Sequence, residues 1–120
     1  MLELKNVSKS YAEVNTKHTV LDSLELNVSK GEIIILLGKS GSGKSTLLNI
    51  ISGIDVPDSG SVTVDGTDIT KLSEKERTIV RRNKIGFIFQ FFNLIPTLTV
   101  KENLQLPLEL KNISEQVEKI

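Results

Sequence analysis

The sequence predicts an α/β fold in which a small antiparallel sheet accompanies a parallel sheet, and three observations lead to this class. Apolar and polar residues alternate over residues 2–4 and 24–28, which is typical of antiparallel strands with one buried face. The run 33–37 is apolar throughout and rich in β-branched residues, which favours a strand covered on both faces. A glycine-rich loop and an apolar helix over residues 44–52 follow it directly.

The elements after this helix are short and separated by turn residues. Apolar residues cover most of the circumference of the predicted helix, so we expect it to be buried, and Gly53 is placed to end it. Residues 55–60 are dense in Asp, Ser, Pro and Gly, which predicts a turn. Residues 62–64 alternate into Asp65-Gly66, which predicts a short strand followed by another turn.

The second half of the chain is predicted to alternate between helix and strand. Ser73 followed by Glu76 is a capping box and predicts a helix from Ser73 to about Asn83. Residues 85–89 read as a strand that ends at Gln90.

A further helical pattern follows over residues 99–111, and we expect Pro107 to interrupt it. Residues 114–120 begin another amphipathic turn or two without a C-terminal cap.

Composition excludes several classes of protein. Fifteen Lys and Arg balance fifteen Asp and Glu, which excludes a nucleic-acid binder that relies on net positive charge. The chain has no cysteine, and His18 is its only histidine, so disulfides, thiolate zinc sites and cysteine nucleophiles are excluded. The N-terminus carries charge where a signal peptide needs an apolar core, and no run approaches a membrane span. The expectation is a soluble, cytoplasmic chain of one domain or part of one.

The glycine-rich loop carries the clearest chemical signal. Gly38–Ser45 matches G-x-x-x-x-G-K-[ST], the phosphate-binding loop of P-loop NTPases. Glycines let successive backbone N–H groups converge on one anion, and the N-terminus of the following helix favours negative charge. Lys44 is placed to reach the β- and γ-phosphates, and the Ser45 hydroxyl is placed to bind Mg²⁺. The loop therefore predicts nucleotide binding.

The sequence argues against some classes of nucleotide-binding protein and leaves others open. A GTPase would need Asn-Lys-x-Asp to recognise its base, and the one Asn-Lys pair, at Asn83, is followed by Ile85 and Gly86 instead. An unrelated P-loop kinase or switch stays open, although nothing resembles the substrate-binding half of a small-molecule kinase.

Several segments, in order, resemble the ATP-binding cassette of ABC transporters. Residues 2–11 resemble the first strand and its adenine-stacking aromatic, and residues 20–32 resemble the strand that leads to the phosphate loop. Residues 52–60 resemble the turn after the first helix, and residues 81–103 resemble the segment that carries the Q-loop glutamine. The amino-acid sequence of these segments is similar to that of cassettes from the lipoprotein-releasing, macrolide-exporting and antimicrobial-peptide-exporting branch of the family.

The resemblance implies a role for each matching residue. Tyr11 would stack on adenine, and Gln90 would contact Mg²⁺ and the attacking water as the catalytic residue of this segment. Ser45 and Gln90 would be the metal ligands. The full set implied to bind the Mg-ATP cofactor is Tyr11, Gly38, Lys39, Ser40, Gly41, Ser42, Gly43, Lys44, Ser45, Thr46 and Gln90.

Structural readings of the same residues stay open. Tyr11 could be a strand-end tyrosine with its ring on the core, and Gln90 could be a solvated strand cap. The aromatic pair Phe91 and Phe92 reads either as a docking surface or as the plug of a small local core.

The chain contains only some of the parts that the resemblance calls for. We find no signature motif, no apolar strand ending in the Walker B aspartate and catalytic glutamate, and no switch histidine beyond Gln90. The prediction is therefore a partial cassette over residues 1–120: a P-loop α/β NTPase with a small antiparallel β subdomain and the start of a helical subdomain, apparently truncated. ATP hydrolysis is expected to be absent or feeble. The alternative function is a non-catalytic, truncated nucleotide-binding module, marginally folded because residues 33–37 would lack parallel neighbours.

Partners and location also come from the resemblance. It implies membrane-spanning permease subunits and a second, identical cassette as partners, with no nucleic acid. It implies a cytoplasmic location, peripheral on the inner face of the cell membrane.

Overall fold

The computed structural model describes residues 1–91 and 93–118, with side chains described as far as Lys111. The chain divides into two compact units, Met1–Thr78 and Ile79–Ile120.

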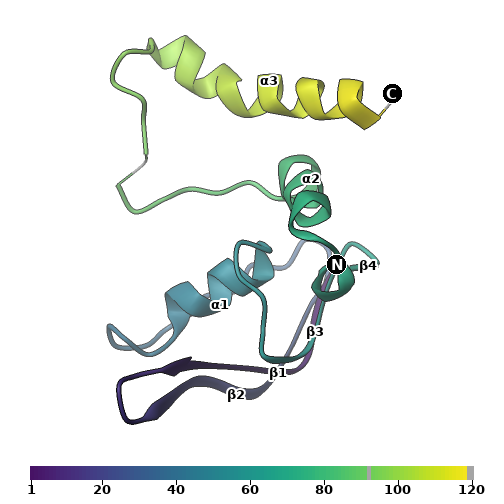
Figure 1. Ribbon diagram of the computed structural model, residues 1–120. Coiled ribbons are helices and arrows are strands. Elements are labelled where there is room, and N and C mark those ends of the chain that lie inside the picture. The colour runs from purple at the N-terminus through teal and green to yellow at the C-terminus, as the bar shows by residue number, and fades with distance from the viewer. Residues whose placement is uncertain (92, 119–120) are drawn as a thin grey trace. The chain divides into compact units, whose positions relative to one another are not determined.

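The first unit is built on a four-stranded antiparallel sheet (Figure 1). Its strands are β1 (Leu2–Ala12), β2 (Lys17–Val28), β3 (Ser59–Val64) and β4 (Thr67–Asp68), in the order β2-β1-β3-β4. The antiparallel sheet that the alternation of apolar and polar residues near the N-terminus predicts is therefore confirmed. This sheet is the small antiparallel sheet that the sequence predicts.

One face of this sheet forms a core with helix α1 (Lys44–Ile51). Leu4, Val7 and Val62 from the strands are at most 2% exposed, and Ile50 from α1 is 1% exposed. The helix is less buried than its sequence predicts, because Leu48 keeps 46% of its surface exposed. Only the face that carries Leu47 and Ile50 is covered in the described chain.

Tight turns join these elements where the sequence places Gly and Asp. Asp65 and Gly66 both have positive φ, 49° and 83°, and they close the two-residue hairpin between β3 and β4. Gly53 has φ 73° directly after the Ser52 cap of α1, so it ends this helix as predicted. Gly60 lies against the backbone of Asn6 in β1, at a spot that a Cβ would overlap.

Helix α2 (Glu74–Lys84) begins as the capping box predicts. The Ser73 amide donates to Glu76 Oε2 at 2.7 Å, and the Glu76 amide donates to Ser73 Oγ at 3.2 Å. These bonds hold the pKa of the Glu76 carboxyl below its ordinary value. The short 3-10 helix η1 (Ile69–Lys71) precedes α2, and the Asp68 side chain caps it.

Two predicted strands are not formed. Residues 33–37 and 85–89 have no assigned secondary structure, and Ile33, Ile35 and Leu37 are 90%, 76% and 89% exposed. A parallel strand exists only where neighbours complete its hydrogen-bond ladder. The sheet of the described chain is wholly antiparallel and pairs with neither segment.

The second unit contains helix α3 (Val100–Glu118). The predicted interruption at Pro107 is wrong, because α3 runs through that residue. A proline removes one backbone hydrogen bond, and the neighbouring turns can keep the helix continuous. The backbone of 114–118 continues the same helix rather than starting a new one, and residues 119–120 lie outside the described residues.

Candidate functional site

The glycine-rich loop curls immediately before α1. Gly41 and Gly43 take positive φ, 81° and 96°, and the Ser42 amide donates to the Lys39 carbonyl at 3.1 Å. The backbone amides of Gly41, Gly43 and Lys44 donate no hydrogen bond to a backbone carbonyl of the described residues. The curl therefore leaves amide donors available to an anion.

The Lys44 side chain folds back over this curl. Its ammonium donates to the Lys39 carbonyl at 2.8 Å and to Ser42 Oγ at 3.3 Å, and it also contacts the Gly38 carbonyl. These bonds place a positive charge inside the loop, next to the free amides. A lysine is a mobile point charge, so the same ammonium can exchange these carbonyls for phosphate oxygens.

The N-terminus of α1 adds to the positive potential. Its N-cap is Gly43, which offers no side-chain cap, and its first turn holds no acidic side chain. The unsatisfied N–H groups and the helix dipole are therefore not neutralised by the helix's own residues. Together, the loop amides, the ammonium and the helix end can bind a multiply charged anion such as a polyphosphate.

Gly43 also fixes the loop against the sheet. A Cβ on this residue would lie 2.8 Å from Val20 Cγ1, 3.1 Å from the Val20 carbonyl oxygen and 3.4 Å from Leu21 Cδ2, all on β2. The loop backbone can approach β2 this closely only without a side chain. The last glycine of the motif thus serves the packing of the loop as well as its curvature.

The donors for a magnesium ion fit at the first turn of α1. The Ser45 residue is exposed, and a hydroxyl oxygen is the hard donor that Mg²⁺ accepts alongside phosphate oxygens and water. Thr46 follows it and is half-buried. Lys39 and Ser40 complete the loop as exposed residues.

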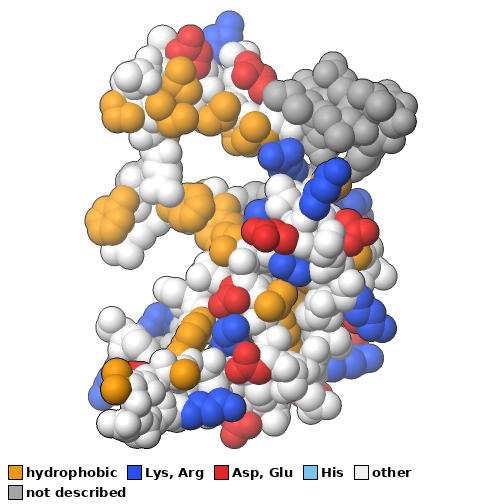
Figure 2. All heavy atoms as spheres, in the orientation of Figure 1, with side chains coloured by type: hydrophobic (Ala, Val, Ile, Leu, Met, Phe, Trp, Pro, Cys, Tyr) orange, Lys and Arg blue, Asp and Glu red, His pale blue; other side chains and the backbone are white. Residues whose placement is uncertain are grey.

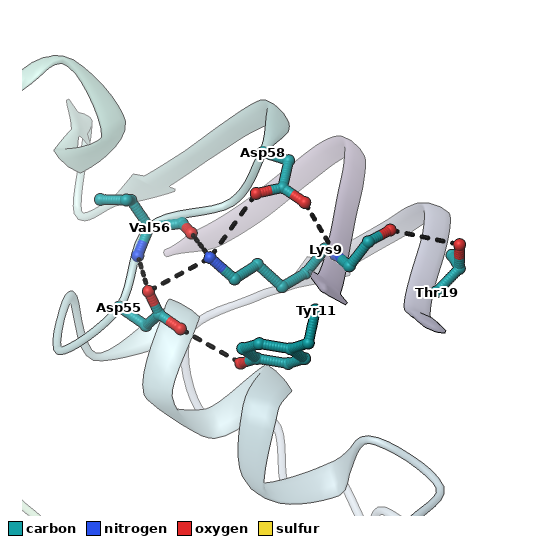
Figure 3. Close-up of polar contacts among 7 residues, drawn as sticks. Lys9, Tyr11, Thr19, Asp55, Val56 and Asp58 are labelled. Carbon is teal, nitrogen blue, oxygen red and sulfur yellow. Dashed lines mark hydrogen bonds and ion pairs between the residues drawn. The ribbon is translucent and has the colours of Figure 1, made fainter. Parts of the chain in front are cut away.

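Tyr11 lies near the end of β1 and is 42% exposed, so its ring is not part of the core (Figure 3). Its hydroxyl donates to Asp55 Oδ2 at 3.2 Å, and the Lys9 ammonium lies 5.5 Å from the ring centroid. The ring is therefore a partly exposed aromatic surface held by polar contacts at its edge and beside its face.

Lys9 is the centre of this cluster. Its ammonium donates to Asp55 Oδ1 at 3.4 Å and to the Val56 carbonyl at 2.9 Å, and lies 3.6 Å from Asp58 Oδ1. Figure 3 shows the ammonium between the two carboxylates. The Lys9 side chain is only 12% exposed, so this cluster is more shielded from water than an ordinary surface ion pair.

The environment of Asp55 keeps its carboxyl ionised. Partial burial acts to raise the pKa of Asp55, but the Val56 amide, the Lys9 charge and hydrogen bonds from Lys9 and Tyr11 outweigh it and lower that pKa. Sequence reasoning missed Lys9 and Asp55. The only available signal was that Lys9 and Tyr11 are two residues apart on one strand, with Asp55 in the turn that the resemblance highlighted.

Gln90 and Phe91 belong to the second unit. Gln90 is an exposed turn residue, and Phe91 is 83% exposed, so Phe91 does not plug a local core. Phe92 lies outside the described residues. A largely apolar groove of about 450 Å³ follows them, formed by Leu94, Ile95, Pro96, Leu98, Val100, Asn103 and Leu104. Figure 2 shows hydrophobic side chains gathered over this part of the chain.

Across residues 1–91 and 93–118, none of the helices combines the length and the apolar character needed to cross a lipid bilayer.

Known proteins resemble the chain over most of its length. It is 52% identical to an uncharacterised ABC transporter ATP-binding protein of Mycobacterium tuberculosis, over 97% of this chain and 47% of that protein. It is 47% identical to the bacitracin export ATP-binding protein of Halalkalibacterium halodurans, over 94% of this chain and 45% of that protein. The chain thus spans about half the length of the curated relatives that it matches.

Solved structures agree with these relatives. An ATP-binding cassette of Methanocaldococcus jannaschii, a dimer in a post-hydrolysis state bound to ADP and phosphate, superposes with a TM-score of 0.87 at 48% identity. This match covers 92% of the chain and 48% of the cassette, and it confirms the α/β P-loop class. The sequence profile described as "ABC transporter" matches residues 21–120. With the curled phosphate-loop motif between β2 and α1, these matches show that the chain belongs to the ABC transporter family.

Proposed function

We propose that this chain is a nucleotide-binding part of an ABC transporter ATPase and that Gly38–Thr46 binds the phosphates of Mg-ATP. The observation that carries the proposal is the curl itself: amides of Gly41, Gly43 and Lys44 without carbonyl partners in the described chain, beside the Lys44 ammonium. Hydrogen bonds to charged groups contribute about 1.5–3 kcal/mol each. A few converging donors are therefore enough for micromolar affinity, which corresponds to about 8 kcal/mol.

The proposed residue roles follow the same logic. Ser45 offers the protein's oxygen to Mg²⁺, and the ion when bound neutralises charge on the β- and γ-phosphates. Tyr11 offers its exposed ring to adenine, because a flat aromatic face stacks on a base with modest specificity. Gln90 is proposed to contact the metal and the attacking water, because its exposed amide side chain both donates and accepts hydrogen bonds.

We propose further that the chain is part of a complete ABC transporter cassette. Residues 1–120 act as one portion of the cassette, whose function is to power membrane-spanning permease subunits as a pair of cassettes at the inner face of the membrane. Two findings support this: the relatives include an export ATP-binding protein, and the solved cassette is a dimer. The exposed apolar residues Phe91, Leu94 and Val100 support a protein-binding surface after Gln90.

The test is Mg-ATP binding by isothermal titration calorimetry to this chain and to its Lys44→Ala variant. The wild type is expected to bind, and loss of the ammonium is expected to weaken binding at least about tenfold, the equivalent of one charge-assisted hydrogen bond. Lys30→Ala removes the same charge from an exposed turn outside the loop, and it should bind as the wild type does.

Turnover is measured on the same samples. Binding without phosphate release agrees with the absence of a catalytic glutamate and a switch histidine from the sequence. Equal ATP affinity in the wild type and Lys44→Ala would refute the proposed site.

A further inference from the structure

The polar cluster around Lys9 lies on the same face of the sheet as the phosphate loop. Lys9 pairs directly with Leu21 across β1 and β2, and directly paired residues in antiparallel strands point to one face. Leu21 Cδ2 lies 3.4 Å from the Cβ position of Gly43 in the loop. Tyr11 is two residues beyond Lys9 and shares Asp55 with it, so Tyr11 also lies on the loop side of the sheet.

The position of the Tyr11 ring depends on contacts at its edge. An exposed tyrosine near a strand end can occupy several staggered rotamers about its Cα–Cβ bond, and each of them points the ring in a different direction. The hydrogen bond from the Tyr11 hydroxyl to Asp55 Oδ2 at 3.2 Å fixes the far end of this side chain. Asp55 is itself held by Lys9 and by the Val56 amide at 2.8 Å, so the acceptor does not move with the ring.

We propose that Asp55 is a positioning residue for nucleotide binding: its carboxylate holds the Tyr11 ring on the loop side, ready to stack on the base. This inference rests on the proposed function, because it needs the phosphates in Gly38–Thr46. Preorganisation of the ring lowers the entropy lost on binding and so raises affinity for the base-bearing ligand alone. A polyphosphate without a base gains nothing from it.

The experiment compares two magnesium-bound probes, ATP and inorganic tripolyphosphate, by titration calorimetry. Stacking on an aromatic side chain contributes about 1–3 kcal/mol per base, so Tyr11→Ala should weaken ATP binding about fivefold to 150-fold. Tyr11→Phe keeps the ring and removes only its hydroxyl, and it should weaken ATP binding about fivefold, a part of the stacking contribution. Asp55→Ala should weaken ATP binding by the same factor. The double variant, Tyr11→Phe with Asp55→Ala, should bind ATP no more weakly than either single variant, because both remove the same hydrogen bond.

Tripolyphosphate affinity is expected to stay unchanged in all of these variants. Asp58→Ala is the matched control, since Asp58 also pairs with Lys9 but accepts from the Ser10 amide, whereas the Tyr11 hydroxyl donates to Asp55, and this variant should bind ATP as the wild type does. Unchanged ATP affinity in Tyr11→Phe and Asp55→Ala would overturn the inference. Equal losses for ATP and tripolyphosphate would also overturn it and leave the proposed function intact, because the cluster would then support only the fold. A wild type that binds neither probe would refute the proposed function itself.

Discussion

At the scale of single residues, backbone conformation decides what the phosphate loop can do. Gly43 combines φ 96° with a distance of 2.8 Å from its Cβ position to Val20 Cγ1. The first property is unfavourable for any L-residue, and the second excludes even a methyl group unless β2 shifts. The pattern G-x-x-x-x-G-K-[ST] records the need for a glycine here but not the neighbour that enforces it.

Gly43→Ala is therefore expected to be more harmful than an ordinary glycine substitution. Left-handed backbone costs a non-glycine residue about 1–2 kcal/mol, and crowding against Val20 should add about 1–3 kcal/mol. Urea unfolding followed by circular dichroism measures the sum. The control is Gly31→Ala, which has a similar φ of 84° but nothing within 4 Å of its Cβ position. Equal destabilisation by the two variants would show that β2 accommodates the methyl group.

At the scale of elements, side chains at helix starts fix the loops that precede them. Thr99 and Glu102 form a capping box at the start of α3, with the Thr99 amide 2.7 Å from Glu102 Oε2. Asn103 then joins the helix to its loop: Nδ2 donates to the Ile95, Leu98 and Thr99 carbonyls, and Oδ1 accepts from the Ile95 amide at 2.9 Å. The loop that forms the apolar groove is thereby tied to the first turn of α3.

Asn103→Ala should release this loop without unfolding the helix. A net hydrogen bond stabilises by about 1 kcal/mol, so the Ile95 amide should exchange its hydrogen about fivefold to tenfold faster. Hydrogen exchange measured by NMR tests this directly. Gln105→Ala, at an exposed position of the same helix, should leave that rate alone. Unchanged exchange in Asn103→Ala would show that the capping box alone holds the loop.

At the scale of the whole molecule, the apolar surface is only partly buried. The core consists of a few side chains from the antiparallel sheet, α1 and η1, whereas most apolar residues at 33–37, 87–89 and 94–108 remain exposed. Exposed apolar surface contributes nothing to folding and promotes association. A domain of this size has a small stability margin even when its core is complete.

We therefore expect a low and broad thermal transition for this chain. Two isoleucines test where the stability comes from. Ile50→Ala, at a 1% exposed site, should cost about 2–5 kcal/mol and leave little folded protein. Ile35→Ala, at a 76% exposed site, should change stability by less than about 0.5 kcal/mol. Differential scanning calorimetry on a verified monomer measures the thermal transition and the loss of stability in each variant. A sharp transition at high temperature, or equal destabilisation by the two substitutions, would contradict this account.

Local signals predicted much of the first unit. The strand alternation, the Asp65-Gly66 turn, the Gly53 cap and the Ser73–Glu76 box all appear as expected, because each depends on residues close in sequence. The polar cluster was not predictable in this way, since Lys9 and Asp55 are 46 positions apart. Only the fold brings them together.

The sequence by itself predicted the anion-binding chemistry that we propose: a loop of glycines, a lysine and a hydroxyl whose spacing suits a polyphosphate. The sequence also predicted family membership, because the order of the motifs along the chain can be identified without a structure. The tertiary structure alone decided which apolar runs became elements. Residues 33–37 have the composition of a buried strand, yet a strand needs partners that supply its hydrogen bonds. It also decided how Tyr11 is held, since that depends on contacts across the sheet.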